Sequence, residues 1–443
     1  MSAPRGSSVP HTYVTRTGDP VPAAPARPSD KAADEAADEA TYEATYEDVA
    51  PIRVDERPAR VRPPITRRRR VIRRIRRGVL AVIVLVLIPV FWSYGHALTR
   101  PGSDSLGIRS TEWIKDNGGR GLVAWAEKTW YQHHAPKKGG QPLAKDIPAV
   151  TAPAHTGTTS LADVPAPPHL LVSQPLDGEG VWQPGPRSAS GAPLVYTTFI
   201  QPSAEYSSLI TGLAWLDPKR VRFQLFAGSE QPGGAGWHQM APLPFSVRPG
   251  LVGAFNSGFK LSDSHGGYYA EGRVAPGHPL LDGQASLILY NDGRATVGAW
   301  GRDAQMGPNI AAVRQNLVLL IDNGQEAADL NRDSLVRWGF TPGNKTFVWR
   351  SGVGVDAGGH LIYAAGELTV HALADVLQAA GAVRAMELDI NSTWVHFFTY
   401  HDDPSVPGGT GGGKLLPQMS APTDLYFKPS SRDFIAAFSN ESR

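Results

Sequence analysis

The sequence predicts an α+β fold: a mixed, strand-dominated sheet with few helices, preceded by a disordered tail and one transmembrane helix. Three observations predict it. Short runs rich in β-branched and aromatic residues recur between turn residues from Pro193 onward. One amphipathic helical pattern follows Thr369. An uncharged run from Val79 to Trp92 stands directly behind an arginine cluster.

The first segment, residues 1–66, has few large apolar residues and many Pro, Ala, Asp, Glu and Arg. Such a composition cannot bury enough apolar surface to offset the entropy of ordering the chain. We therefore expect a disordered cytoplasmic tail. A solvated spacer is favoured over a regulated interaction tail built on Tyr42 and Tyr46.

An arginine-rich stop at residues 67–77, RRRRVIRRIRR, is followed by an apolar span at residues 78–98. The span is near the ~20 residues needed to cross a bilayer. A cleaved signal peptide is the alternative. Because the preceding tail is much longer than a normal signal n-region, we expect an uncleaved signal anchor. The positive-inside rule then puts the N-terminus in the cytoplasm and everything beyond the span outside the cell membrane, in a single pass.

The partner implied by the arginine cluster is the membrane, through its anionic headgroups, and not nucleic acid. The overall net charge of +2 sums an acidic tail, a basic stop and a mixed exterior, so it identifies no partner. Cysteine is absent, which excludes disulfides, a thiol nucleophile and thiolate metal sites. The sequence leaves the oligomeric state open.

Residues 99–135 predict amphipathic juxtamembrane helices, broken at Gly118-Gly119. Their tryptophans suit either the outer membrane interface or packing against the following domain, and the pattern does not separate the two. Residues 136–168, rich in Pro, Ala and Thr, predict a linker. Residues 169–438 are long enough to form a domain held by its own core.

Strand signals dominate that domain. The Asn291-Asp292-Gly293 turn between two such runs predicts a hairpin. Further strand-like runs are LVYTTFI, SSLITGLAWL, RVRFQLFAG, Leu251–Phe255 and AVRQNLVLLIDNG.

A Gly-rich strand beginning at Arg350 is followed by a helix between Thr369 and Gly381, and then by a second strand. A crossover helix between two strands is the simplest interpretation. The second strand ends in Glu387 and Asp389, which stand on one face about 7 Å apart because side chains repeat every second residue.

This arrangement resembles the phosphodiester glycosidase family. The family pattern is an N-G-G-F turn, an R-[ST]-x-x-G strand, a helix and a strand ending L-D-G-G-G-S. Here the turn is Asn256-Ser257-Gly258-Phe259, the first strand carries Arg350, Ser351 and Gly354, and the second ends LDINST at residues 388–393. The chain departs from the pattern at Ser257 and at residues 390–392, where side chains replace glycines.

The resemblance implies a hydrolase, and Asn256, Arg350 and Asp389 carry over from the family motifs. With Glu387 from the same strand end, Asp389 and Arg350 are the expected catalytic residues. Asp389 is the expected base or nucleophile, Arg350 the phosphate ligand and Glu387 a second carboxylate. Each also has a structural interpretation, as a turn-forming acid or as one half of an ion pair. The residues expected to bind substrate are Asn256, Ser257, His265, Asn391, Ser392 and Trp394.

No cofactor and no metal site are expected, because the chain lacks H-E-x-x-H, H-x-H and EF-hand patterns. A hard cation such as calcium held by carboxylates stays open. The function expected is a membrane-anchored, extracytoplasmic hydrolase that cleaves a glycosyl-1-phosphodiester bond in cell-envelope glycans or their precursors. The alternative, motivated by Ile390, Asn391 and Ser392 in place of glycines, is an inactive relative that binds envelope polysaccharide.

Overall fold

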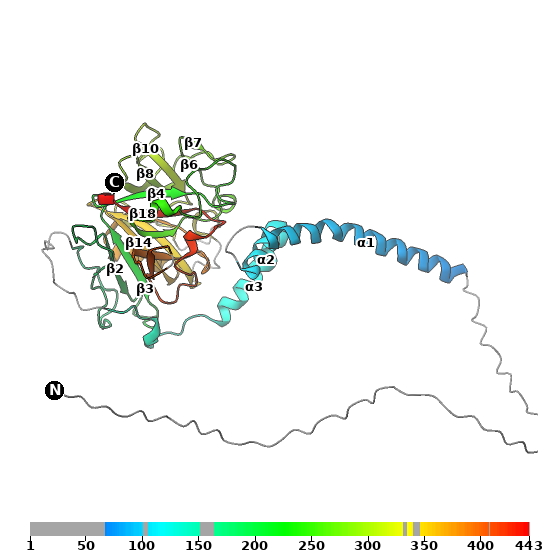
Figure 1. The fold of residues 1–443 in the computed structure, drawn as a ribbon. Helices are drawn as coiled ribbons and strands as arrows, with labels where there is room; N and C mark the ends of the chain where they lie inside the picture. The colour runs from blue at the N-terminus through cyan, green and yellow to red at the C-terminus, as the bar shows by residue number, and fades with distance from the viewer. Residues whose placement is uncertain are drawn as a thin grey trace, which may run out of the picture. The chain divides into compact units, whose positions relative to one another are not determined.

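The computed structural model describes residues 67–100, 105–150, 164–330, 335–339, 346–406 and 408–442. The predicted tail, residues 1–66, and residues 151–163 of the predicted linker lie outside them. The chain divides into two units, residues 1–73 and 74–443. All described strands, and all described helices after α1, belong to the second unit (Figure 1).

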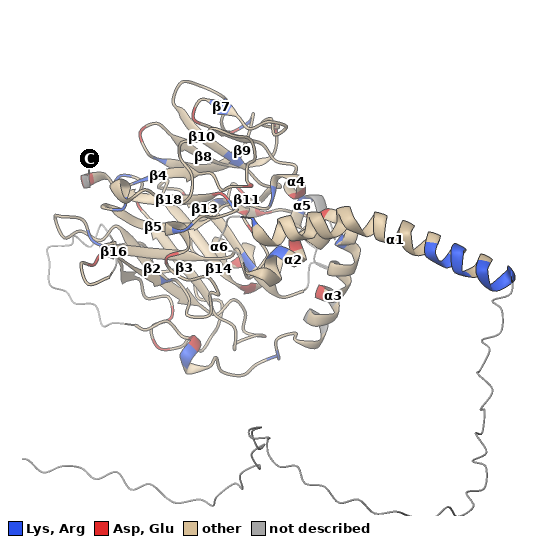
Figure 2. Cartoon of the chain, turned by 45° about the vertical axis from the view of Figure 1, so that its right-hand side comes forward, with Lys and Arg blue, Asp and Glu red and all other residues tan. Residues whose placement is uncertain are grey.

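Helix α1 (Arg67–Thr99) is long and apolar enough to cross a membrane, as the sequence predicts. None of its residues is buried. Figure 2 shows its basic residues gathered in the first turns, with an uncharged remainder. A signal sequence shares these properties, so the helix establishes a candidate span and not its orientation.

Two helices follow α1. Helix α2 (Leu106–Ile114) begins at Ser105, whose hydroxyl accepts a hydrogen bond from the Ile108 N–H at 3.4 Å. A π-helical turn, η1 (Lys115–Gly119), leads into α3 (Arg120–His133). The chain kinks where the sequence predicts a break, because Gly118 takes a φ of 87° that a glycine adopts without strain.

The strands form three sheets. The eight-stranded sheet has the order β1-β2-β3-β14-β13-β15-β11-β12, and the two five-stranded sheets have the orders β7-β6-β10-β8-β9 and β17-β16-β5-β18-β4. The bounds are β1 (Gln183–Pro184), β2 (Val195–Ile200), β3 (Thr211–Leu216), β4 (Val221–Phe226), β5 (Leu251–Asn256), β6 (Tyr268–Ala270), β7 (Arg273–Val274), β8 (Ala285–Tyr290), β9 (Ala295–Ala299), β10 (Ile310–Gln315), β11 (Leu319–Asp322), β12 (Gln325–Glu326), β13 (Val348–Asp356), β14 (Leu361–Leu368), β15 (Ala382–Glu387), β16 (Phe397–Asp402), β17 (Thr410–Lys414) and β18 (Phe434–Ser439). The shorter helical elements are η2 (Ala144–Asp146), η4 (Phe245–Val247), α4 (Leu261–Ser264), α5 (Leu335–Trp338), η6 (Leu425–Phe427) and η7 (Asn440–Ser442).

The strand-dominated architecture with few helices is confirmed, but the predicted mixed sheet is not. Every ladder between named strands in the described part of the chain is antiparallel. The predicted hairpin at residues 291–293 joins β8 to β9. Short turns of this kind connect antiparallel neighbours, whereas parallel neighbours need a crossover.

The Gly-rich segment after Arg350 forms two strands where the sequence predicts one. Asp356 accepts hydrogen bonds from the N–H groups of Gly358 and His360, at 2.8 and 2.9 Å, and this turn folds β13 back as β14. Both β14 and β15 pair antiparallel with β13, one on each side, so they run parallel to each other.

Helix α6 (Val370–Ala379) connects these two parallel strands and confirms the predicted crossover helix. The Thr369 hydroxyl caps it by accepting a hydrogen bond from the Ala372 N–H at 3.1 Å, and Gly381 leaves it with a φ of 94°. Its apolar face is buried in the core that covers one side of the eight-stranded sheet.

The larger core lies between the sheets and fixes the strand ends that matter below. Phe255 of β5 and Phe397 of β16 stack with centroids 5.8 Å apart, and Tyr363 of β14 contacts both rings. The end of β5 therefore lies beside β16 and β14. This packing brings the 256–259 turn to the segment that follows β15.

Candidate functional site

A cavity with a volume of about 580 Å³ lies at several of the predicted site residues. One side is formed by residues that follow β5 and β15 together with Arg432, and the other by α2, η1 and α3. Its lining residues are Glu112, Lys115, Asp116, Arg120, Gly121, Glu127, Phe259, Lys260, Ser262, Asp263, His265, Gly339, Asp389, Ile390, Asn391, Trp394 and Arg432.

Asp389 lies at this cavity with a fixed orientation. Its Oδ1 accepts hydrogen bonds from the N–H groups of Ile390 and Asn391, at 2.8 and 3.0 Å, and its Oδ2 accepts one from Arg432 at 2.8 Å. Burial raises the pKa of Asp389 to about 6, although Arg432 and the two N–H groups act in the opposite direction. The carboxylate is thus oriented, and its pKa lies above the ordinary range of an aspartate.

Arg432 is the partner that the sequence analysis missed. It is buried, donates to the Gly258 carbonyl at 3.1 Å as well as to Asp389, and its guanidinium carbon lies 5.1 Å from the centroid of the Trp394 ring. It follows η6, far along the chain from the predicted motifs, and no motif marks it. Only the folded chain brings it to Asp389.

A second, much smaller cavity adjoins the first through Asp389, Trp394 and Arg432. Its volume is about 10 Å³, close to that of one water molecule by this measure. Four buried polar atoms of its lining residues have no hydrogen-bond partner among the described residues: Trp394 Nε1, His396 Nδ1, Arg432 Nε and Asp433 Oδ1. Such atoms suit a small polar ligand, because an unpaired buried donor or acceptor is costly.

His396 is unsuited to proton transfer at neutral pH. Burial lowers its pKa to about 3, and its Nε2 is 2.6 Å from the Tyr426 hydroxyl. The imidazole is therefore neutral, and it lines the small cavity as a hydrogen-bonding group.

Asn256 is the last residue of β5, and its side-chain amide is hydrogen-bonded within the fold. Its Nδ2 donates to the Ser351 hydroxyl at 2.9 Å, and its Oδ1 accepts from the Tyr363 hydroxyl at 2.8 Å. It lines the small cavity but ties three strands together. Ser257, also on that cavity, donates its hydroxyl to Asp433 at 2.6 Å.

Gly258 is required by the close approach of Asn316. A Cβ at Gly258 would stand 2.8 Å from the Asn316 side chain, closer than packed atoms allow. Asn316 accepts from the Phe259 N–H at 3.1 Å and donates to the Glu387 and Leu388 carbonyls. It thereby joins the turn to the end of β15.

Arg350 and Glu387 form a different kind of pair. Both are fully buried, they are ion-paired with each other, and neither lines the two cavities. Arg350 also donates to the Leu368 carbonyl at 3.1 Å. Burial raises the pKa of Glu387 to about 7, although Arg350 acts to lower it.

The remaining predicted residues divide between cavity and surface. His265, Asn391 and Trp394 line the large cavity. Trp394 is buried and His265 is exposed. Ser392 is exposed and lines neither cavity.

The residues that replace the family glycines, 390–392, keep ordinary backbone conformations. None of the three has a positive φ. The N–H groups of Ile390 and Asn391 still point at Asp389. The replacement therefore adds the Ile390 and Asn391 side chains to the cavity without backbone strain, and the N–H donors that orient the carboxylate remain.

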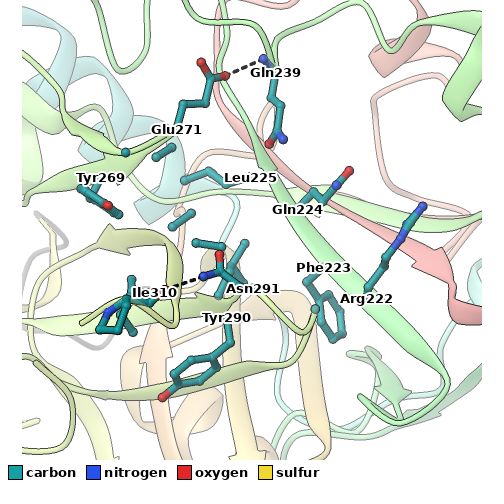
Figure 3. Close-up of a pocket in the computed structure, with 17 residues that line it drawn as sticks. Arg222, Phe223, Gln224, Leu225, Gln239, Tyr269, Glu271, Tyr290, Asn291 and Ile310 are labelled. Carbon is teal, nitrogen blue, oxygen red and sulfur yellow. Dashed lines mark hydrogen bonds between the residues drawn. The ribbon is translucent and has the colours of Figure 1, made fainter. Parts of the chain in front are cut away.

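A cavity of about 510 Å³ lies elsewhere, between β4 and the β6-β10-β8 sheet (Figure 3). Glu271, on its rim, accepts hydrogen bonds from the N–H groups of His238 and Gln239. That carboxylate therefore holds the neighbouring loop. No group of three or more His, Cys, Asp or Glu able to hold a metal occurs in the part of the chain that the structure describes.

Comparison with known families identifies the region around the site. Residues 249–404 match the family model described as phosphodiester glycosidase. The chain carries a phosphodiester glycosidase domain. This match includes the 256–259 turn, Arg350 and Asp389, and it ends before Arg432. The domain belongs to a family of hydrolases that act on phosphodiester-linked sugars. No curated protein matches the sequence.

Solved structures similar to the phosphodiester glycosidase domain are distant. The zebrafish N-acetylglucosamine-1-phosphodiester α-N-acetylglucosaminidase catalytic domain, auto-inhibited by its pro-peptide, is 15% identical, with a TM-score of 0.38, over 58% of this chain and 87% of its own. A hypothetical protein from Synechocystis is 14% identical, with a TM-score of 0.29, over 52% of this chain and 59% of its own. A putative exported protein from Burkholderia pseudomallei is 11% identical, with a TM-score of 0.31, over 54% of this chain and 75% of its own.

Proposed function

We propose that this protein is a membrane-anchored hydrolase whose domain lies outside the cytoplasm, where it cleaves the glycosyl bond of a sugar-1-phosphodiester in a cell-envelope glycan or its lipid-linked precursor. One observation carries the proposal: Asp389 is oriented by two N–H groups and Arg432 at a cavity large enough for a sugar. The family match supports the reaction class.

The proposed reaction breaks the bond between the sugar C1 and the phosphate oxygen. The electron pair of that bond leaves with the phosphate, so the departing group needs positive charge more than it needs a proton. Arg432 lines the cavity, and its guanidinium supplies that charge. Trp394 also lines the cavity, and its ring contacts Arg432.

Asp389 acts in this proposal as base or nucleophile. As a base, it takes a proton from water while the water oxygen bonds to C1. As a nucleophile, it bonds to C1 first and water then displaces it. The anomer of the released sugar distinguishes the two courses. A pKa near 6 leaves the carboxylate ionised at neutral pH, as both courses require.

The envelope location is supported by the N-terminal features. The basic residues of α1 precede its apolar stretch. In α3, three large apolar side chains are exposed, namely Leu122, Trp125 and Trp130. Tryptophan is enriched at membrane interfaces, so this face of α3 suits the outer surface of the bilayer.

The reaction is tested with Asp389→Asn in the full-length protein, on a panel of sugar-1-phosphodiesters, by the release of free sugar. Asparagine keeps the shape but neither attacks C1 nor takes the proton, so release should fall by about three orders of magnitude or more. Asp424→Asn, at an exposed ion pair with Lys428, is the matched control. Equal release by Asp389→Asn and wild type would refute the assignment. Wild-type binding of the panel without release would favour the inactive polysaccharide-binding alternative.

The location is tested by labelling, since the chain has no cysteine of its own. Ala189→Cys lies on an exposed part of the domain, and Ser7→Cys lies before the span. In intact cells, a membrane-impermeant maleimide should label Ala189→Cys and spare Ser7→Cys. The reverse pattern would contradict the extracytoplasmic location.

A further inference from the structure

One wall of the site cavity comes from outside the matched domain. Six of its lining residues belong to α2, η1 and α3, and we call them the juxtamembrane wall: Glu112, Lys115, Asp116, Arg120, Gly121 and Glu127. They precede the family match at residue 249 by more than a hundred positions. The family motifs therefore do not complete this cavity by themselves.

The wall is joined to the domain by a buried ion pair. Glu112 and Lys260 are both buried and are paired with each other, and the Lys260 Nζ also lies 3.4 Å from Asp116. A second, more exposed pair links Arg120 to Asp263 at 2.8 Å. Removing two charges from water is expensive, so a plain tether would not need the first pair.

The charge of Glu112 acts on the proposed reaction centre. Burial raises the pKa of Glu112, but Lys260 and Arg432 together hold it below its ordinary value. In turn Glu112 contributes to the raised pKa of Asp389. Glu112 is thus within electrostatic reach of the two residues that form the oriented pair at the cavity.

The wall also connects the cavity to the membrane helix. The Trp113 Nε1 donates to the Ser93 hydroxyl at 3.0 Å, and Tyr94 and Trp113 stack edge to face with centroids 5.0 Å apart. Ser93 and Tyr94 lie in the last turns of α1. Helix α2 therefore contacts the end of the membrane helix through Trp113 and the cavity through Glu112.

We propose that the juxtamembrane wall is a fixed part of the substrate-binding site, held by the Glu112–Lys260 pair, and that the site is complete only when α2 is seated on the domain. This rests on the proposed function. Glu112 is then a positioning residue: it holds Lys260 and the wall in place, and it touches no reacting atom. The loss of the wall weakens substrate binding and leaves the chemical step intact.

Charge reversal and its compensation test the pair in the full-length protein. Glu112→Lys and Lys260→Glu each set like charges against each other, and each should raise KM for a sugar-1-phosphodiester by about tenfold or more. The double variant restores the pair with its direction reversed, and its KM should return to within about threefold of wild type. The matched control is the same swap at the exposed Lys138–Glu205 pair, 2.5 Å apart, which should leave KM unchanged.

Three results would overturn the proposal. The single variants could match wild type, which would make the wall irrelevant to binding. They could be more active, which would make it a cover that blocks the site. The double variant could be no better than the worse single variant, which would remove the coupling. The milder variant Glu112→Gln removes the charge without reversing it. Its thermal unfolding midpoint, measured together with KM, separates misfolding from a loss of substrate binding.

A cross-link tests the seating of the juxtamembrane wall without turnover. Arg120→Cys and Asp263→Cys place the only two thiols of the chain at the exposed pair, within reach of a short bis-maleimide. The cross-link should form in high yield, to the same extent with and without a sugar-1-phosphodiester, because a fixed wall is seated before substrate binds. Failure to form, or formation only when the sugar-1-phosphodiester is present, would contradict a fixed wall. A cross-link that forms in a protein that hydrolyses no sugar phosphodiester would refute the proposed function alone.

Discussion

Two buried arginine–carboxylate pairs stand at the end of the same strand, β15, and they differ in access. Asp389 with Arg432 lines both cavities, and its oxygens are oriented by the following backbone. Glu387 with Arg350 is sealed, with no exposure on either partner. Residues two apart thus form a pair open to ligand and a pair that only the protein contacts. Proximity in sequence did not give the two acids a shared role.

The difference arises where β15 ends. Glu387 is the last strand residue, and its side chain is held by Arg350 of the neighbouring β13. Beyond it the chain turns, and Asp389 bonds the next two N–H groups. The two acids no longer follow the alternation of a strand, so their side chains meet different partners.

The largest expected effect separates the arginines by activity. Arg432→Met removes a cation that lines the cavity, and kcat/KM for a sugar-1-phosphodiester should fall by about 10²–10³-fold. Steady-state kinetics per folded protein measure this. Arg350→Met is the control, and it should change kcat/KM per folded protein by less than about threefold. An equal loss of kcat/KM in both variants would contradict the different roles given to Arg432 and Arg350.

The free energy of unfolding should order the same two variants the other way, with Arg350→Met affected more than Arg432→Met. Arg350→Met leaves Glu387 buried without its cation, and the free energy of unfolding should drop by about 3–5 kcal/mol. Urea unfolding of the folded variant checks this. A stability close to wild type would mean that the sealed pair is not a structural element.

The pH dependence of activity sharpens the assignment of Asp389. Its pKa is raised to about 6, and the reaction needs the ionised form. The value of kcat/KM should therefore rise with pH up to about 6 and level off above it, with about a tenfold loss for each pH unit below. An acid limb near 4, the ordinary range of an aspartate, would contradict the raised pKa.

The smallest expected effect on kcat/KM is at Ser392, a residue of the predicted motif that does not line the cavities. Ser392 is exposed and lines neither cavity, so Ser392→Ala should alter kcat/KM by less than about twofold. Asn391→Ala, at the cavity, should alter KM more. A larger effect of Ser392 would mean that substrate extends beyond the cavity over this turn.

Local signals allowed much of the fold to be predicted. The Thr369 cap, the helix that follows it and the turn at residues 291–293 each depend on a few neighbouring residues, and all three are confirmed. The sheet arrangement was predicted less well. The hairpin between β13 and β14 and the antiparallel ladders depend on which strands pair with each other. The composition of a single strand does not specify its partner.

The sequence by itself determined the apolar helix, the strand-rich domain and the family motifs that contain Asp389. Only the tertiary structure decided which charges face the cavity. It placed Arg432 beside Asp389 and Lys260 at the same cavity, and it sealed Arg350 with Glu387. The physical reason is that a strand or helix follows from local periodicity, whereas the access and partner of a charged side chain depend on packing between segments far apart in the chain.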